Sequence, residues 1–409
     1  MNRYVIVGGG VAGATAAQNL RRLDPAAAVS ILADEPHPYY YRPRLWEFIA
    51  GTSDPAALYY RPAAWYAGQQ IDLRLNSPVR RIQPRDHTVT LASGETIPFD
   101  RLLLAVGAES FLPDIPGTRL PGVFVLRTLQ DAAAIRDRAA HSRRAVVVGG
   151  GLLGLETARA LCRPGIDVTV VEIVPHLLPR QLDREGAALL QRHLEGLGIS
   201  VLTGARTSAV AGDTAAAGIR LEDGRAVEGE LVLFSAGVVP RIGLARDSGL
   251  QTGRGIIVDA HLQSSAPDVF AAGDAAEIDG RVYGLVPPAI EQARAASQNM
   301  AGGGTAEYRG TLPSASLKLL GMDLTSLGEA TADDPSLTVR RTTDENACAY
   351  QKVVLRDGVV IGAILLNDPA RVPLFGRLIA SRQAVSEVQD RLLDPAFDLN
   401  GWMASRATE

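Results

Sequence analysis

Two stretches of the chain carry the same spacing of glycines directly after a short apolar run. The glycines are Gly8, Gly10 and Gly13 in the first stretch and Gly149, Gly151 and Gly154 in the second. In such a G-x-G-x-x-G pattern, the first glycine permits a tight turn, the second lets the backbone approach a pyrophosphate, and the third lets a helix pack closely on the strand. The N–H groups at the start of that helix hold an anion without a basic side chain. The two stretches therefore predict two dinucleotide-binding units.

A dinucleotide-binding unit also needs an acidic residue about 20 residues further on, which hydrogen-bonds the ribose hydroxyls. In the second unit, the apolar run at 168–171 leads directly into Glu172. In the first unit, Ala33 occupies the corresponding position, and Asp34 and Glu35 follow it. We favour Glu35 as the ribose ligand of the first unit, with Asp34 as the alternative.

The apolar runs that follow extend the duplication beyond the glycine turns. The run at 102–104 ends in three small residues, and the run at 231–234 ends in the same way before Gly237. The small residues after the first run are Ala105, Val106 and Gly107. Small residues at a strand end let the backbone pass close to a ligand. We therefore expect both strand ends to border the nucleotide sites.

Further signals lie near the end of the repeated part and in the tail. The run at 268–272 ends in Gly273 and Asp274, and Pro287 and Pro288 then begin an Ala-rich helix that we expect to end near 301. The tail from 311 to 409 predicts short strands around a hairpin turn at 357–358, followed by helices from about 370. Lys318 is the one residue there whose surroundings suggest site chemistry.

Composition indicates a soluble globular protein of two or three domains. The chain has 409 residues, of which 46% are hydrophobic and 21% charged. No apolar run reaches the ~18 residues that a membrane span needs, and the chain opens directly into a strand. We therefore expect a cytoplasmic protein without membrane contact. A net charge of −4 argues against nucleic acid as the default partner.

The cysteines and lysines narrow the chemistry. Cys162 and Cys348 are the only cysteines, and their wide separation predicts neither a disulfide framework nor a metal knuckle. We expect no metal site. Of the 41 basic residues, only Lys318 and Lys352 are lysines. A lysine in a chain that otherwise uses arginine points to a role that the planar guanidinium cannot fill.

This combination resembles the two-dinucleotide-domain flavoprotein family of pyridine-nucleotide oxidoreductases. Within that family it is most similar to NADH:rubredoxin reductases and to the flavin-binding part of NADH-dependent nitrite reductases. The residues that carry the resemblance are the two glycine turns, the Tyr-Tyr-Arg-Pro-Arg-Leu loop at 40–45, Glu156, Glu172, Gly273, Asp274 and Lys318. The resemblance covers nearly the whole chain.

The resemblance implies an α/β fold of the glutathione-reductase type, with two Rossmann-like three-layer dinucleotide-binding domains and a small α+β C-terminal domain. FAD would bind a discontinuous domain formed by 1–111 and 241–310. NADH would bind a domain at 112–240. The C-terminal domain would comprise 311–409.

The resemblance also implies roles for single residues. Asp274 would bind the FAD ribityl chain, Arg42 and Pro43 would lie along the flavin, and the helix beginning near Pro288 would point its N-terminus at the flavin edge where negative charge collects. Lys318 would approach that edge or the acceptor face, and Glu156 would hold the nicotinamide amide. These two are the expected catalytic residues. The remaining expected cofactor contacts are Val11, Ala12, Val79, Ala105, Val106, Gly107, Leu152, Leu153 and Gly237.

Two features depart from the family pattern. Ala33 stands where the FAD ribose acid is usual, and no C-x-x-C or C-x-x-x-x-C pair is present. The second departure argues against dithiol or peroxide chemistry by cysteine.

The leading hypothesis is an NADH-dependent oxidoreductase in which FAD passes electrons to a small redox protein of the rubredoxin or ferredoxin type. One alternative is an NADH-sensing interaction protein resembling apoptosis-inducing factor. Another is an oxidase that uses O2 or a quinone. An acidic redox partner would need a local arginine patch, for which Arg42, Arg44, Arg61, Arg340 and Arg341 are candidates.

Overall fold

The computed structural model describes residues 1–302, 304–319, 321–332 and 334–406. The chain divides into two compact units. Unit 1 comprises Met1–Phe111, Leu126–Ala133 and Gly237–Thr311, and unit 2 comprises Leu112–Val125, Ala134–Ala236 and Leu312–Glu409. The three-domain division predicted from the sequence is finer than this one and stays a prediction. Gly303, just after the expected end of the Ala-rich helix, and Leu320, two residues after Lys318, lie outside the described residues.

Unit 1 contains a five-stranded parallel sheet in the order β19-β7-β1-β2-β3. The helices of the unit are α1 (Val11–Leu23), α2 (Leu45–Ala50), α3 (Pro55–Leu58), α4 (Ala63–Gly68), α8 (Gly243–Asp247), α9 (Val286–Met300) and the 3-10 turns η1 (Arg42–Arg44) and η2 (Gly273–Ala275). Its strands are β1 (Arg3–Val7), β2 (Ala28–Leu32), β3 (Ile71–Arg74), β4 (Val79–Gln83), β5 (Thr88–Leu91), β6 (Thr96–Pro98), β7 (Arg101–Leu104), β8 (Ala108–Ser110), β17 (Val238–Pro240), β18 (Ile256–Val258), β19 (Val269–Ala271) and β20 (Ala276–Ile278).

Unit 2 contains a second parallel sheet, in the order β12-β11-β10-β16-β9, and a five-stranded antiparallel sheet in the order β21-β22-β25-β24-β23. The helices are α5 (Leu129–Ala139), which begins in unit 1, α6 (Leu152–Leu161), α7 (Arg184–Gly196), α10 (Val372–Ser381), α11 (Leu399–Arg406) and the 3-10 turn η3 (Pro369–Arg371). The strands are β9 (Val123–Val125), β10 (Arg144–Val148), β11 (Asp167–Val171), β12 (Ile199–Leu202), β13 (Thr207–Ala211), β14 (Gly218–Leu221), β15 (Ala226–Glu228), β16 (Leu231–Phe234), β21 (Ser314–Leu319), β22 (Met322–Gly328), β23 (Thr338–Asp344), β24 (Ala349–Arg356) and β25 (Val359–Leu366).

Four strands of each parallel sheet follow one another in the same succession, β1-β2-β3-β7 and β10-β11-β12-β16, and the parallel sheets with their helices confirm the mixed α/β fold class. In each unit a glycine turn joins the first strand to a helix, and three short antiparallel strands, β4-β5-β6 or β13-β14-β15, are inserted before the next sheet strand. The central strands are almost completely buried, as expected for parallel strands that are covered on both faces. The duplication therefore extends through four strands of each parallel sheet, whereas the fifth strand comes after the others in unit 1 (β19) and before them in unit 2 (β9).

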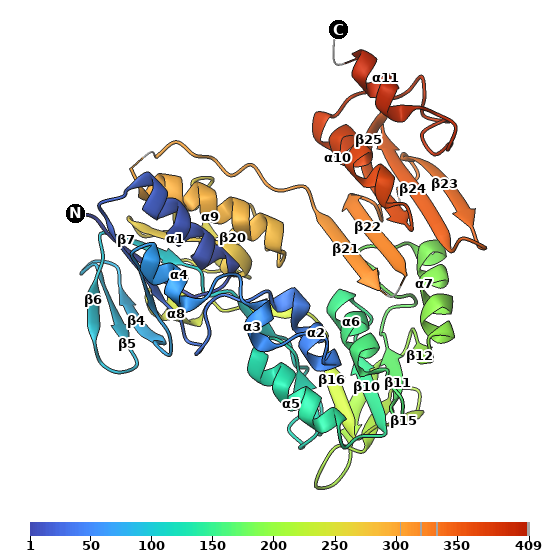
Figure 1. The fold of residues 1–409 in the computed structure, drawn as a ribbon, viewed down its shortest axis with the longest axis horizontal. Coiled ribbons are helices and arrows are strands. Elements are labelled where there is room, and N and C mark those ends of the chain that lie inside the picture. The colour runs from blue at the N-terminus through green and yellow to red at the C-terminus, as the bar shows by residue number, and fades with distance from the viewer. Residues whose placement is uncertain (303, 320, 333, 407–409) are drawn as a thin grey trace. The chain divides into compact units, whose positions relative to one another are not determined.

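In unit 1, α1 and α9 lie side by side against the parallel sheet (Figure 1). Alanines on both helices are fully buried, which lets the two helices approach closely. The helix α9 begins at Val286, slightly before the Pro288 start that the sequence suggested, because proline is tolerated in the first helical turn. A Cβ atom on Gly273 would lie 3.0 Å from that of Ala12 and 3.6 Å from that of Ala289, so the first turns of both helices lie beside the same loop of unit 1.

Candidate dinucleotide-binding sites

The first glycine turn is held by backbone packing. Gly8 has φ +114°, and a Cβ atom added there would lie 2.1 Å from the carbonyl oxygen of Ala105. A Cβ on Gly13 would lie 2.0 Å from the carbonyl oxygen of Gly8. Gly10, the residue that caps α1, has no atom within 4 Å of the Cβ position. The turn therefore leaves an open space at the helix N-terminus, which suits a pyrophosphate.

The second glycine turn repeats this geometry. Cβ atoms on Gly149 and Gly154 would lie 2.3 Å and 2.1 Å from the carbonyl oxygens of Ser235 and Gly149. Gly151 caps α6 and again faces open space. Both units therefore have the cradle that a dinucleotide needs, formed by glycines at the three expected positions.

The acids that follow the two turns differ in their surroundings. Glu172 is 7% exposed, and its two carboxylate oxygens accept hydrogen bonds from the N–H groups of Gly150 at 2.7 Å and Val174 at 2.9 Å. A Cβ on Gly150 would lie 3.2 Å from that of Glu172, whereas a Cβ on Gly9 would lie 2.8 Å from that of Ala33. Ala33 is therefore the structural counterpart of Glu172, as the sequence indicated.

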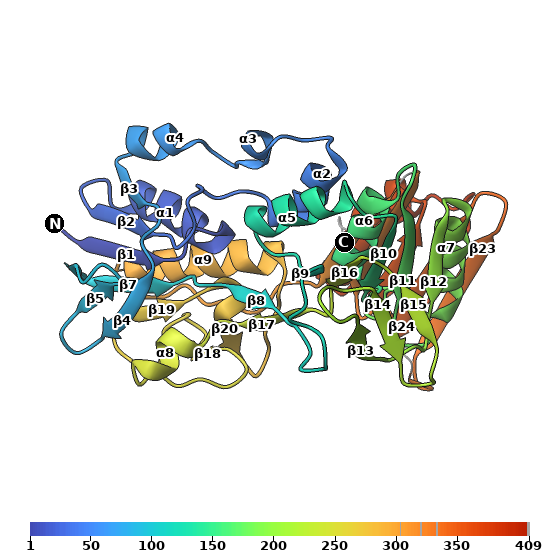
Figure 2. The same cartoon turned by 90° about the horizontal axis from the view of Figure 1, so that it is seen from below.

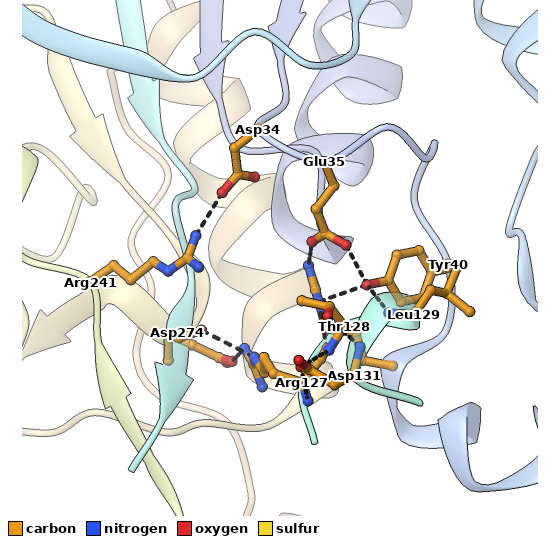
Figure 3. Close-up of polar contacts among 11 residues, drawn as sticks. Asp34, Glu35, Tyr40, Arg127, Thr128, Leu129, Asp131, Arg241 and Asp274 are labelled. Atoms are coloured by element: carbon orange, nitrogen blue, oxygen red, sulfur yellow. Dashed lines mark hydrogen bonds and ion pairs between the residues drawn. The ribbon is translucent and has the colours of Figure 1, made fainter. Parts of the chain in front are cut away.

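Glu35, the favoured ribose acid, lies in a polar cluster within unit 1 (Figure 3). The Arg42 guanidinium donates to Glu35 Oε1 at 2.5 Å, and the Tyr40 hydroxyl donates to Glu35 Oε2 at 2.5 Å. Arg42 also donates to the carbonyl oxygen of Arg127 at 2.6 Å, and Tyr40 accepts from the N–H of Leu129 at 3.2 Å. Both oxygens of Glu35 are therefore engaged by side chains of its own unit.

Asp34 points away from this cluster (Figure 3) and lines a cavity of about 510 Å³. The cavity also borders Gly8, Val79 and Val106, which are three of the expected cofactor contacts. Arg241 lies in its wall and donates to Asp34 Oδ2 at 2.8 Å. Asp34 is thus beside the first glycine turn, in a space that is open to a ligand.

Asp274 is held by a residue that the sequence did not single out. The Arg127 guanidinium donates to Asp274 Oδ2 at 2.8 Å and to the carbonyl oxygen of Ala108 at 3.1 Å. Gly273, which precedes Asp274, has φ +81° and donates its N–H to Gln292 Oε1 at 2.8 Å. Gln292 is 1% exposed on α9, so this helix fixes the turn that carries Asp274.

Four further residues predicted from the sequence to contact the cofactors differ in their exposure. Glu156 is half-buried on α6, two residues beyond the last glycine of the second turn, and Pro288 is buried in the first turn of α9. Pro43 is exposed in η1, next to Arg42. Lys318 on β21 is 86% exposed and lies 3.8 Å from Asp323. Its expected role at the flavin stays a prediction.

The sequence reasoning missed three polar residues that organise these sites, namely Arg127, Arg241 and Gln292. The cause is the same for each. Their partners are distant in sequence, as for Arg127 and Asp274, which are 147 residues apart. A turn composition rich in proline and glycine gave no signal that Arg127 would face inward.

The chain matches the pyridine nucleotide-disulphide oxidoreductase family over residues 2–299 and the rubredoxin NAD+ reductase C-terminal domain over residues 313–383. It therefore belongs to the pyridine nucleotide-disulphide oxidoreductase family, which confirms the resemblance seen in the sequence. It is 30% identical to the NADH-rubredoxin oxidoreductase of Clostridium acetobutylicum, over 90% of this chain and 91% of that protein.

Two other proteins show how similarity varies in coverage. The chain is 34% identical to a nitrite reductase [NAD(P)H] of Bacillus subtilis, over 94% of this chain but only 48% of that protein. It thus spans about half the length of the longer relatives it matches. The crystal structure of a ferredoxin reductase from Rhodopseudomonas palustris aligns with a TM-score of 0.89 and 29% identity, covering 98% of this chain and all of that one.

Three further observations on the residues described concern metal ligands, cysteines and long apolar helices. No group of three or more histidine, cysteine, aspartate or glutamate side chains among them could hold a metal ion. Both cysteines are free, and Cys162 lies just beyond the end of α6 rather than within it. Within the described ranges, every helix is too short or too polar to span a bilayer.

The Tyr40 cluster predicts a pH-dependent contribution to stability. Burial raises the pKa of Tyr40, and Glu35 adds to this rise although Arg42 opposes it. In the unfolded chain a tyrosine ionises near pH 10. The stabilisation by Tyr40 is therefore complete below about pH 10 and is lost as the pH rises above it. We expect Tyr40→Phe to lower the free energy of unfolding by about 1 to 3 kcal/mol at pH 8 and to weaken the loss above pH 10.

Urea unfolding followed by tryptophan fluorescence between about pH 8 and pH 11 measures both effects. If the free energy of unfolding falls equally above pH 10 in the wild type and in Tyr40→Phe, Tyr40 is not the source of the pH dependence.

Proposed function

We propose that unit 1 binds FAD and unit 2 binds NADH, and that the protein is an NADH-dependent reductase of a small electron-transfer protein of the rubredoxin or ferredoxin type. The observation that carries this proposal is the pair of glycine turns, each with an open position at a helix N-terminus. Family membership and the C-terminal match over residues 313–383 support it. The names of the Clostridium and Rhodopseudomonas relatives support an acceptor of this kind.

In the FAD site, we propose Asp34 rather than Glu35 as the ribose ligand. Asp34 lines the cavity beside Gly8, whereas both oxygens of Glu35 are already bound by Arg42 and Tyr40. Glu35 then affects the flavin site only indirectly, because its carboxylate fixes the orientation of the Arg42 guanidinium. Its charge also offsets that of Arg42, which would otherwise be costly to desolvate beside a buried tyrosine.

Asp274 is the proposed ligand of the ribityl chain, and Arg127 orients it. The Arg127 guanidinium occupies one carboxylate oxygen of Asp274 and leaves the other to accept from a hydroxyl group. Gln292 holds the preceding peptide from α9. The N-terminus of α9 would place its positive end toward the flavin, where it favours the anionic reduced form.

In the NADH site, Glu172 is the proposed ligand of the adenosine ribose. The backbone N–H groups of Gly150 and Val174 fix both of its oxygens, and each oxygen keeps a lone pair for a ribose hydroxyl. A 2′-phosphate would meet this carboxylate as a like charge. We therefore propose a preference for NADH over NADPH, and we propose Glu156 on α6 as a contact of the nicotinamide end.

When bound, FAD would accept a hydride from NADH and deliver electrons singly to the acceptor. The side chains described above position both nucleotides and do not themselves carry electrons. The sequence has neither a C-x-x-C nor a C-x-x-x-x-C pair, which argues against a dithiol relay between the flavin and the acceptor.

Rapid mixing tests the reaction class. NADH should bleach the flavin absorbance of the purified protein within seconds. Addition of rubredoxin or ferredoxin should restore the absorbance at least about tenfold faster than air-saturated buffer does. Recovery that is fastest with O2 or a quinone would identify an oxidase or quinone reductase, and slow recovery with every acceptor would favour an NADH-sensing protein.

Matched substitutions in the two turns test which nucleotide binds where. Valine at Gly10 or Gly151 would fill the open position, and both residues have extended backbone angles that valine adopts readily. We expect Gly10→Val to yield a folded protein without FAD. Gly151→Val should retain FAD but lose NADH binding by at least about tenfold. Flavin content by absorbance and NAD+ affinity by calorimetry measure this, and loss of FAD from both variants would contradict the allocation.

Glu172 tests the coenzyme preference. Glu172→Ala removes a buried hydrogen bond to ribose, so kcat/KM for NADH should fall by about 10- to 100-fold, equivalent to roughly 1.4 to 2.8 kcal/mol. The preference for NADH over NADPH should narrow. Glu172→Gln is the control, because it keeps an acceptor but removes the charge that repels a 2′-phosphate. Equal use of both coenzymes by the wild type would refute the role of Glu172.

A further inference from the structure

Lys352, one of the two lysines in the chain, is buried in unit 2. Its side chain on β24 is 3% exposed, and Nζ lies 3.2 Å from Asp183 Oδ2. Burying an ammonium group costs free energy unless its charge is paired, and the Asp183 carboxylate supplies that pairing. Asp183 is the residue that immediately precedes α7.

The Asp183 carboxylate gathers donors from two distant parts of the chain. The Tyr350 hydroxyl donates to Oδ2 at 2.7 Å, and the N–H of Gly186 donates to Oδ1 at 3.1 Å, which caps α7. Burial alone would raise the pKa of Asp183, but these two donors and Lys352 outweigh it and lower that pKa. Asp183 therefore joins the antiparallel sheet of unit 2 to the start of α7, and Figure 2 shows α7 beside β23 of that sheet.

The segment at 173–182, the NADH loop, connects the proposed ribose ligand Glu172 to Asp183. Within it Leu178 has φ +49°, a left-handed conformation that is unfavourable for leucine by about 1 kcal/mol or more. Leu178 is fully buried, and its N–H donates to the carbonyl oxygen of Gly150 at 3.1 Å. Gly150 in turn donates to Glu172. The strained residue is thus one hydrogen bond away from Gly150, the residue whose N–H group holds the ribose acid.

Packing joins the far end of the NADH loop to β24. A Cβ on Gly186 would lie 3.0 Å from Leu182 Cδ2 and 3.0 Å from the ring of Tyr350. The N–H of Leu182 donates to the carbonyl oxygen of Leu178 at 2.8 Å. A continuous path of contacts therefore runs from the antiparallel sheet through Asp183 and Leu182 to Leu178. A strained backbone persists only where its surroundings enforce it.

We propose that Lys352 and Tyr350, acting through Asp183, are positioning residues that hold the NADH loop in its strained conformation and thereby set the discrimination between NADH and NADPH. This inference rests on the proposed NADH site of unit 2. The compact ammonium of a lysine fits a buried point contact beside a tyrosine hydroxyl, whereas the planar fork of arginine needs more room. That requirement explains why this position carries one of the two lysines.

The test measures coenzyme discrimination, which a purely structural role would leave unchanged. The ratio of kcat/KM for NADH to that for NADPH is measured with ferricyanide as acceptor, so no protein partner is needed. In Lys352→Met and in Tyr350→Phe we expect the ratio to fall by about tenfold and about threefold, respectively, mostly through KM. Calorimetric titration with NAD+ should show a matching loss of affinity. The flavin content should stay that of the wild type.

Arg192→Gln is the matched control. It removes an exposed ion pair with Glu345 that links α7 to the turn between β23 and β24, without touching Asp183. The control should keep the ratio of the wild type. Tyr350→Phe loses only one hydroxyl and keeps the test decisive if Lys352→Met does not fold.

The outcomes separate the inference from the function on which it rests. A wild-type flavin that NADH does not reduce would overturn the proposed function itself. If NADH reduces the wild type and the ratio in Tyr350→Phe or Lys352→Met stays unchanged, even with a lowered melting temperature, the cluster only stabilises the fold and the inference is wrong.

Discussion

Backbone packed against backbone at the two glycine turns is the constraint on which the rest of the structure depends. At Gly8 and Gly13, and again at Gly149 and Gly154, a single added carbon would lie within 2.4 Å of a carbonyl oxygen. No side chain fits there, so each helix begins directly at the end of its strand. That placement directs the free N–H groups of the helix toward the open position of the turn. In unit 1 the cavity and Asp34 lie beside the first turn, and in unit 2 Glu172 bonds to the second turn.

The two units use the same frame with different electrostatics. In unit 2, the acid after the second strand is held by backbone N–H groups, so Glu172 is preorganised and keeps free lone pairs. In unit 1, that position is Ala33. Of the two acids that follow, Asp34 lines the cavity and Glu35 forms an ion pair with Arg42. The two glycine turns thus share one geometry, and the acids beyond them have different partners.

Two shielded ion pairs join segments that are distant in sequence. Arg127 with Asp274 in unit 1 and Lys352 with Asp183 in unit 2 are both partly or wholly shielded from water. Such pairs contribute little net stability, because desolvation offsets attraction, but loss of one partner leaves an unpaired buried charge. Their value here is geometric, since each fixes a turn that carries, or leads from, a proposed nucleotide ligand.

The sequence alone determined the features that depend on local pattern. The glycine spacing predicted both turns, the apolar runs predicted the parallel strands, and the residue order by itself placed Ala33 where the second unit has Glu172. The tertiary structure decided which polar residues meet. It separated Asp34 from Glu35, brought Arg127 to Asp274, and buried Lys352 while leaving Lys318 exposed. Local pattern reports how a segment folds and which face is apolar, whereas a long-range ion pair depends on how the sheets and helices pack, which no short stretch of sequence encodes.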